Sequence, residues 1–153
     1  MKDLTISLDN KDLKVLDLLK DNSKLTTSQI SKKTGIPITT VHNRIRKMEK
    51  LGIIVGYTLK LNYKKLGQGI LCYVLVGIIY NLPSGKKVKQ EDVAKKIKKF
   101  GGVEEVSIVA GGTDVLVKVR AKDIEGLNDF IVRKLRELEG VDKTQTLIVL
   151  SSI

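Results

Sequence analysis

The chain has 153 residues, enough for one medium-sized domain or two small ones, and its 42% hydrophobic content excludes a disordered polypeptide. Its formal charge of +11 favours a polyanionic partner. The single cysteine excludes an intramolecular disulfide, and the longest apolar run is too short to span a bilayer, so we expect a cytoplasmic protein with no membrane partner.

Residues 8–22 are predicted to form the first helix, because their apolar side chains recur at helical spacing. These side chains are Leu13, Val15, Leu16, Leu18 and Leu19. Acidic residues near the start and a lysine near the end suit the dipole of such a helix. We expect this helix to pack across two further helices in a domain that spans residues 1–52.

A second helix is expected to begin at Thr26 and to end at Gly35. Thr26 and Gln29 have the spacing of a capping box, in which each side chain satisfies a backbone amide of the other residue. Leu25 and Ile30 occupy the positions of a hydrophobic staple. Glycine is the residue that commonly follows a helix end.

A third helix is predicted to open at Ile36-Pro37 and to run to Leu51, with Gly52 ending it. Pro37 can begin a helix, but its side chain cannot accept the amide hydrogen bond that a serine would accept there. Two helices joined by so short a turn form a helix-turn-helix motif, whose second helix enters the major groove of DNA.

The third helix has an apolar face and a polar, cationic face. Its apolar face, assigned to the core, consists of Ile38, Val41, Ile45 and Met48. The other face suits a major groove, because Arg and Lys address guanine, Asn addresses adenine, and Thr meets phosphates or thymine methyl groups. With the start of the second helix included, the candidate DNA contacts are Thr26, Thr39, Thr40, His42, Asn43, Arg44, Arg46, Lys47 and Lys50.

A solvated surface helix is the alternative interpretation of this polar face. The capped preceding helix, the tight turn and the nearby basic charge favour DNA binding over it. Arg44 lies at the edge of the core stripe, where it binds either a phosphate or a carboxylate of its own domain. His42 is either a DNA contact or a plain surface residue.

Residues 53–67 are predicted to be an extended connector, either a hinge between two domains or an ordinary linker strand. After it, short apolar strands alternate with helical patterns. Over residues 68–153 the predicted elements are a strand at 69–80, a helix at 89–100, strands at 103–110 and 114–120, a helix at 124–138 and a strand at 141–150. This βαββαβ order is the ferredoxin-like pattern, so the fold class is α+β.

Right-handed crossovers would place both helices of this second domain on one face of a four-stranded sheet, with the first strand central. The last helix presents a stripe of apolar side chains to the sheet: Ile124, Leu127, Ile131, Leu135 and Leu138. The first strand is apolar on both faces, so its open face would leave a larger patch than a soluble monomer exposes. We therefore expect a homodimer through the sheets, and hence two recognition helices.

The second domain also contains a run of lysines. They are Lys86, Lys87, Lys89, Lys95, Lys96, Lys98 and Lys99. Such a run is usually a solvated helix face, and the alternative is contact with DNA that wraps around an assembly.

Several short motifs are distributed along nearly the whole chain, in a specific order and at specific spacings. They are Leu8-Asp9 with Asp12 and Val15-Leu16, Gly35-Ile36, Val41, Arg44-Ile45, Met48, Gly52-Ile53-Ile54, Gly56-Tyr57, Gly111-Gly112-Thr113-Asp114, and Gly140-Val141 with Thr144 and Thr146. With these motifs the chain resembles the Lrp/AsnC, or feast–famine, family of prokaryotic transcription regulators. The resemblance implies a DNA-binding N-terminal domain, a C-terminal domain that dimerises and binds small effectors, often amino acids, and assembly of dimers into higher oligomers.

The same resemblance implies an effector site, whose candidate residues are Gly112, Thr113, Asp114, Thr144 and Thr146. Asp114 would pair with a ligand ammonium group, and the glycine backbone would approach a carboxylate closely. The alternative is a plain tight turn in which Asp114 caps local amides and the two later threonines are strand residues. No cofactor and no metal are expected.

Other classes of function fit this sequence less well. An enzyme is disfavoured because the only histidine, His42, is far in sequence from Cys72, and no phosphate-binding loop or zinc-ligand spacing is present. The main alternative is an architectural, chromatin-like protein that binds DNA with little sequence preference. A module that senses an effector and acts on other proteins is a further alternative.

Overall fold

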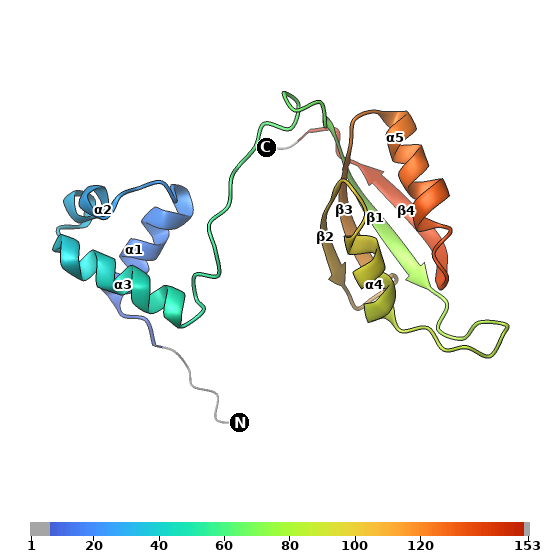
Figure 1. Ribbon diagram of the computed structural model, residues 1–153, viewed down its shortest axis with the longest axis horizontal. Coiled ribbons are helices and arrows are strands. Elements are labelled where there is room, and N and C mark those ends of the chain that lie inside the picture. The colour runs from blue at the N-terminus through green and yellow to red at the C-terminus, as the bar shows by residue number, and fades with distance from the viewer. Residues whose placement is uncertain (1–6, 152–153) are drawn as a thin grey trace. The chain divides into compact units, whose positions relative to one another are not determined.

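The computed structural model describes residues 7–151, so the parts of the predicted domains at residues 1–6 and 152–153 lie outside the described residues. The chain divides into two compact units, Met1–Lys60 and Leu61–Ile153 (Figure 1). Each unit has its own hydrophobic core. Over residues 7–151, no helix has the length and apolar character needed to cross a membrane.

The first unit contains the three predicted helices: α1 (Asn10–Asp21), α2 (Thr27–Thr34) and α3 (Ile38–Lys50). The capping box of α2 is confirmed, because Thr26 Oγ1 accepts from the Gln29 amide at 3.2 Å and the Thr26 amide donates to Gln29 Oε1 at 2.9 Å. Gly35 ends α2 in the left-handed conformation with a φ of 72°. Pro37 precedes α3 without a side-chain cap, as its chemistry predicts.

The core of the first unit differs from the predicted stripes at two positions. Its buried apolar residues are Val15, Leu19, Ile30, Ile36, Val41 and Met48. Leu13 is 45% exposed and Ile38 is 50% exposed, so their assignment to the core is wrong. The buried stripe of α1 passes through Asp12 instead, and Ile36, in the turn before α3, is buried in place of Ile38.

The connector that follows α3 contains no strand among the described residues, so the linker strand, one of its two predicted alternatives, is not formed. Ile53 and Ile54 pack against the first core, whereas Val55 and Leu59 are 93% and 71% exposed. An alternating apolar pattern forms a strand only where a neighbouring strand pairs with it. The connector has no such neighbour within the described chain, and its backbone stays irregular.

The second unit has the predicted βαββαβ order. Its elements are β1 (Ile70–Ile78), α4 (Gln90–Lys98), β2 (Val103–Ile108), β3 (Val115–Ala121), α5 (Ile124–Asn128) continued by a π-helix (Asp129–Leu135), and β4 (Val141–Ile148). The strands form one antiparallel sheet in the order β2-β3-β1-β4, so β1 is central as predicted.

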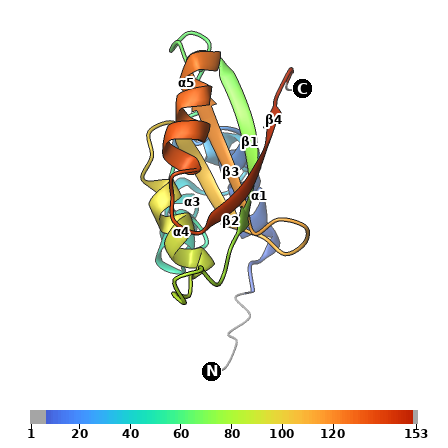
Figure 2. The ribbon, with the colours of Figure 1, turned by 90° about the vertical axis from the view of Figure 1, so that its right-hand side faces the viewer.

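Both α4 and α5 cover the same face of this sheet (Figure 2). On the covered face, β1 buries Cys72, Val74 and Val76 in the core. Burial raises the pKa of the Cys72 thiol, which is consistent with a packing role. On the open face, Tyr73 and Leu75 keep part of their surface exposed.

The last helix differs from the regular helix predicted over residues 124–138. After Asn128 the backbone widens into the π-helix, which shifts the register of the following side chains relative to α5. Leu127 and Leu135 are buried as predicted, but Ile124 is 61% exposed, so its assignment to the core is wrong. Phe130, within the π-helix, is buried instead.

Candidate nucleic-acid interface

The outward face of α3 carries a straight row of polar and cationic side chains. Thr39, Asn43, Arg46 and Lys50 are spaced i, i+4, i+7 and i+11, which places them in one stripe along the helix. All four are exposed, and the buried core residues of α3 lie on its opposite face. We call this row the α3 ridge.

The central side chains of the α3 ridge are available to a ligand. Within residues 7–151, Asn43 and Arg46 form no side-chain hydrogen bond or ion pair. An exposed carboxamide can pair with the edge of adenine, and an exposed guanidinium can pair with the edge of guanine. The ridge therefore has the chemistry of base recognition at its centre.

The remaining predicted contacts lie beside the ridge. Thr40 is partly buried on one flank of α3, and His42 is exposed on the other. Thr26 caps the start of α2, where its hydroxyl oxygen accepts from the Gln29 amide. The hydroxyl hydrogen is therefore able to donate to a phosphate. Side chains at the flanks of a recognition helix suit the DNA backbone, because phosphates line the edges of the groove.

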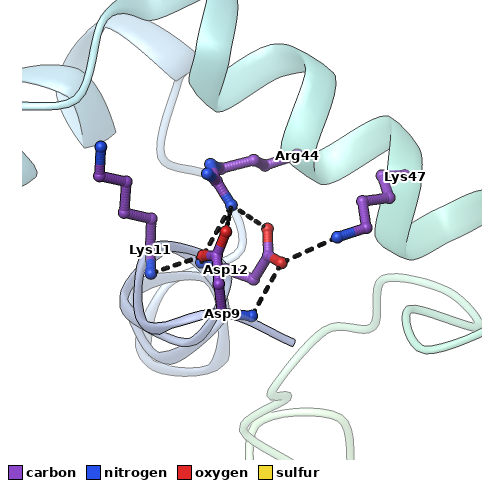
Figure 3. A network of polar contacts seen from close by, with 5 residues as sticks. All are labelled: Asp9, Lys11, Asp12, Arg44 and Lys47. Carbon is purple, nitrogen blue, oxygen red and sulfur yellow. Dashed lines mark hydrogen bonds and ion pairs between the residues drawn. The ribbon is translucent and has the colours of Figure 1, made fainter. Parts of the chain in front are cut away.

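Arg44 lies at the centre of an ion-pair network that joins the start of α1 to α3 (Figure 3). Its Nη1 donates to Asp9 Oδ2 at 2.7 Å and to Asp12 Oδ1 at 2.5 Å, and Lys47 Nζ donates to Asp12 Oδ2 at 3.1 Å. Asp12 has no exposed surface, so two cations surround a fully buried carboxylate. The sequence predicted either a phosphate or a carboxylate of its own domain as the partner of Arg44, and the structure shows the carboxylate.

Both carboxylates of the network are stabilised in the ionised form. The hydrogen bond from Arg44, followed by that from the Asp12 amide, lowers the pKa of Asp9 to about 2. Burial by itself would raise the pKa of Asp12, but hydrogen bonds from Arg44, Lys47 and the Asp9 amide hold that pKa below its ordinary value. At neutral pH the network is charged and links α1 to α3.

The role of Asp12 was missed when the sequence alone was considered. Asp12 lies one helical turn before Val15 and two turns before Leu19, so it shares their buried face. A carboxylate on a core-facing stripe requires a cationic partner. Arg44 lies at the edge of the core stripe of α3, so it was the residue in the sequence that could supply this cationic partner.

The turn between β2 and β3 holds three effector-site candidates: Gly112, Thr113 and Asp114. Asp114 accepts from the Tyr80 hydroxyl at 2.5 Å and from the Ile78 amide at 2.8 Å. These two hydrogen bonds, that of Tyr80 first, lower the pKa of Asp114. The Thr113 hydroxyl donates to the Val76 carbonyl at 2.9 Å, so both side chains close the turn against the end of β1.

The other two effector-site candidates lie on β4. Thr144 is opposite Val76 and accepts from Arg136 Nε at 3.1 Å, while Thr146 is opposite Val74. Because Thr113 bonds to the same Val76, the sheet brings Thr113 and Thr144 to one end of β1. Thr146 lies two residues further along the strand.

Two family models match the chain. Residues 8–55 match a winged helix-turn-helix DNA-binding domain, and residues 74–153 match the Lrp/AsnC ligand binding domain. An HTH-type transcriptional regulator of Pyrococcus furiosus is 45% identical, over 92% of this chain and 91% of its own length. The chain belongs to the Lrp/AsnC family.

Similarity to other regulators extends over almost the whole chain. The HTH-type transcriptional regulator FL11 of Pyrococcus furiosus is 35% identical, over 94% of this chain and 89% of FL11. Among solved structures, LrpC of B. subtilis is 28% identical with a TM-score of 0.82, covering 97% of this chain and 98% of LrpC. A Neisseria meningitidis transcriptional regulator in complex with L-methionine is 26% identical with a TM-score of 0.86, covering 96% of this chain and 92% of that regulator.

Membership of the Lrp/AsnC family gives the class of function. The chain is a DNA-binding transcription regulator, and the α3 ridge lies inside the segment that matches the DNA-binding model. The turn at residues 111–114 lies inside the segment that matches the ligand-binding model. The relatives are transcriptional regulators, a class that acts by binding DNA.

Proposed function

We propose that this Lrp/AsnC protein reads a specific DNA sequence with the α3 ridge in the major groove. Asn43 and Arg46 are assigned to base edges, Thr39 to a thymine methyl or a phosphate, and Lys50 to a phosphate. The observation that carries this assignment is the exposure of all four side chains along one stripe, opposite the buried face of α3.

The flanking residues are assigned to the DNA backbone. Thr26, Thr40 and His42 would donate to phosphates on the two sides of the groove. Lys47 has a side chain that is 48% exposed, so it can bind a phosphate while it stays close to Asp12. Arg44, only 19% exposed and bound to two carboxylates, is assigned to positioning α3 and not to a DNA contact.

The test is a selection of bound duplexes from a random-sequence pool, followed by affinity measurements. Asn43→Ala should relax the preference at one base position and cost about 1–3 kcal/mol of binding free energy. Lys14→Ala, at an exposed position of α1, is the control and should keep the wild-type preference. If Asn43→Ala combined with Arg46→Ala leaves the selected motif and the affinity unchanged, α3 does not read the DNA.

An architectural role is the alternative, and the formal charge of +11 favours it. The two roles differ in the ratio of affinities for a selected duplex and a random duplex at one salt concentration. We expect a ratio of about a thousand or more, as for specific regulators. A ratio near unity would assign the protein to the architectural class.

We further propose that two copies associate through the open faces of their sheets, and that such dimers assemble further. Across that face Leu75 lies opposite Leu116, and Tyr73 lies opposite Leu147, which is 47% exposed. A second copy related by a two-fold axis is the commonest cover for such a patch. The resulting dimer would present two α3 ridges to a pseudo-palindromic operator.

We also propose that an amino acid binds at the turn of residues 111–114. The Neisseria meningitidis transcriptional regulator of similar structure was solved with L-methionine, which supports this ligand class. Both oxygens of Asp114 are engaged within the unit, so the exposed Gly111-Gly112 backbone is the better ligand contact. Nothing lies within 4 Å of a Cβ placed on either glycine, which leaves room for a ligand.

Titration calorimetry with a panel of amino acids tests this site. The wild type should bind at least one member of the panel, and Gly112→Val should abolish that binding. Gly101→Val is the matched control, because Gly101 also has nothing within 4 Å of a Cβ, and it should bind as the wild type does. Equal binding by the wild type and Gly112→Val would place the effector elsewhere.

A further inference from the structure

A shallow groove on the second unit is lined mainly by cations. It lies between the loop that precedes α4 and one side of α4, and its lysines are Lys86, Lys87, Lys89, Lys95 and Lys96. The only carboxylates that line it are Asp92 and Glu139, so five cations face two anions among the lining residues. We call this feature the lysine groove.

Most of the charge in the lysine groove is unpaired. Lys86 is the exception, because its Nζ lies 2.5 Å from Glu139 Oε2. Over the described residues 7–151, the other lysines of the groove form no ion pair and all are exposed; they are Lys87, Lys89, Lys95 and Lys96. The surface therefore retains a net positive charge after its internal pairing is complete.

The dipole of α4 accounts for only part of this arrangement. Cations in the last turn, such as Lys95 and Lys96, are stabilised by the negative end of the helix. Lys87 and Lys89 precede α4, at its positive end, where the dipole disfavours cations. Glu91 and Asp92, in the first turn of α4, offset part of the repulsion among these lysines. The groove still has five lysines against two carboxylates, and an external polyanion would neutralise the remaining positive charge.

We propose that the lysine groove binds the phosphate backbone of double-stranded DNA, as a second contact in addition to the α3 ridge. The proposal rests on the proposed function, because DNA held by α3 raises the local concentration of phosphates around the second unit. Lysine ammonium groups act as point charges on phosphates and carry no base preference. The contact is therefore independent of sequence and dependent on DNA length.

The spacing of the lysines suits such a backbone. Lys89 and Lys96 are seven residues apart, which corresponds to about 10 Å along a helix axis. One DNA strand presents a phosphate about every 3.4 Å along its axis, so the groove spans roughly three phosphates. Each lysine that meets a phosphate releases a counterion and steepens the salt dependence of binding.

Duplexes of two lengths separate the two contacts. A duplex of about 20 base pairs, roughly two helical turns, engages the α3 ridges. A duplex of about 150 base pairs, close to the persistence length of DNA, also offers many phosphates outside the α3 contact, which the lysine groove can bind. The measured quantity is the slope of log affinity against log salt concentration. For the variant K87Q/K89Q/K96Q this slope should become shallower by roughly two to three on the long duplex, at about 0.9 per lost phosphate contact. On the short duplex the slope should stay unchanged.

The matched control is K64Q/K65Q/K122Q, which removes the same charge from exposed positions outside the groove. It should retain the wild-type slope on both duplexes. The proposal is overturned if the two triple variants behave alike on the long duplex, or if K87Q/K89Q/K96Q loses the same slope on both lengths. Failure of the proposed function would be seen separately, as a wild type without preference for any duplex sequence and insensitive to Asn43→Ala.

Discussion

Asp12 places a negative charge inside a small helical domain, and its partners decide whether that charge is tolerated. A buried carboxylate without partners costs several kcal/mol in free energy of folding. Here Arg44, Lys47 and the Asp9 amide all donate to it. The carboxylate is thereby satisfied, and the start of α1 is linked to the middle of α3.

Replacement of Asp12 by alanine should therefore destabilise the first unit strongly. The variant leaves the largely buried Arg44 guanidinium without one of its two carboxylates, and we expect a loss of roughly 3 kcal/mol in the free energy of unfolding. Urea denaturation followed by circular dichroism measures this loss. Asp17→Ala, on the exposed face of α1, is the control, and a loss for Asp12→Ala no larger than the control's would remove the network's structural role.

The lowered pKa of Asp9 predicts how stability depends on pH. Because its pKa falls from the ordinary 3.8 to about 2 on folding, the stabilisation is complete above pH 3.8 and is lost as the pH falls towards 2. Asp9→Asn keeps the cap of α1 and removes the charge. The difference in melting temperature between wild type and variant should be constant from neutral pH to about pH 4 and should shrink below it. A difference that persists unchanged to pH 2 would contradict the ion pair.

Individual residues could be predicted where local geometry determines their direction. Asn43 points outward because it lies opposite the centre of an apolar stripe. The contacts of Asp114 could not be predicted, because Tyr80 and Ile78 are 34 and 36 residues away in sequence. Only the pairing of β1 with β3 brings these residues together.

At the scale of elements, the helix ends were predictable because local chemistry sets them. The Thr26 cap, the Gly35 end and the uncapped start at Pro37 were all expected from residue type and spacing. The burial of Ile36 instead of Ile38 was not predictable, because tertiary packing decides which of two nearby apolar residues enters the core. The π-helix after α5 likewise has no signal in a hydrophobic pattern that fits a regular helix.

The capping box predicts the effect of a change at the start of α2. Thr26→Ala removes the acceptor for the Gln29 amide and should lower the free energy of unfolding by about 1 kcal/mol. Thr26→Ser keeps a hydroxyl at the same position and should retain nearly all of the stability. Thermal unfolding of the protein without DNA measures both variants, and equal melting temperatures for Thr26→Ala and wild type would show that the cap contributes nothing.

At the scale of the whole molecule, the order of the elements was predictable because the hydrophobic period changes along the chain. Helical spacing before residue 53 and short apolar strands after residue 68 predict two units of different architecture. The state of the connector could not be predicted, since its alternating apolar residues lack a pairing strand within the described chain. The partner that covers the open face of the sheet is likewise not described by a single chain, because it would be a second molecule.

The proposed dimer predicts a change of mass on a single substitution. Leu75→Arg places a charge at the centre of the open face and should convert the dimer to a monomer, as measured by light scattering. Leu66→Arg, in the connector where Leu66 is already 59% exposed, is the matched control and should leave the mass unchanged. A wild type that is itself monomeric, or a Leu75→Arg variant that stays dimeric, would exclude this interface.

Recognition of bases by the α3 ridge is tested most directly by a double-mutant cycle between Asn43 and the operator. Affinities are measured for wild type and Asn43→Ala, each against the selected duplex and duplexes with one base pair changed. We predict a coupling energy of about 1–3 kcal/mol at one base pair of each half-site and none at the others. Coupling that is absent at every base pair would contradict the placement of this ridge in the major groove.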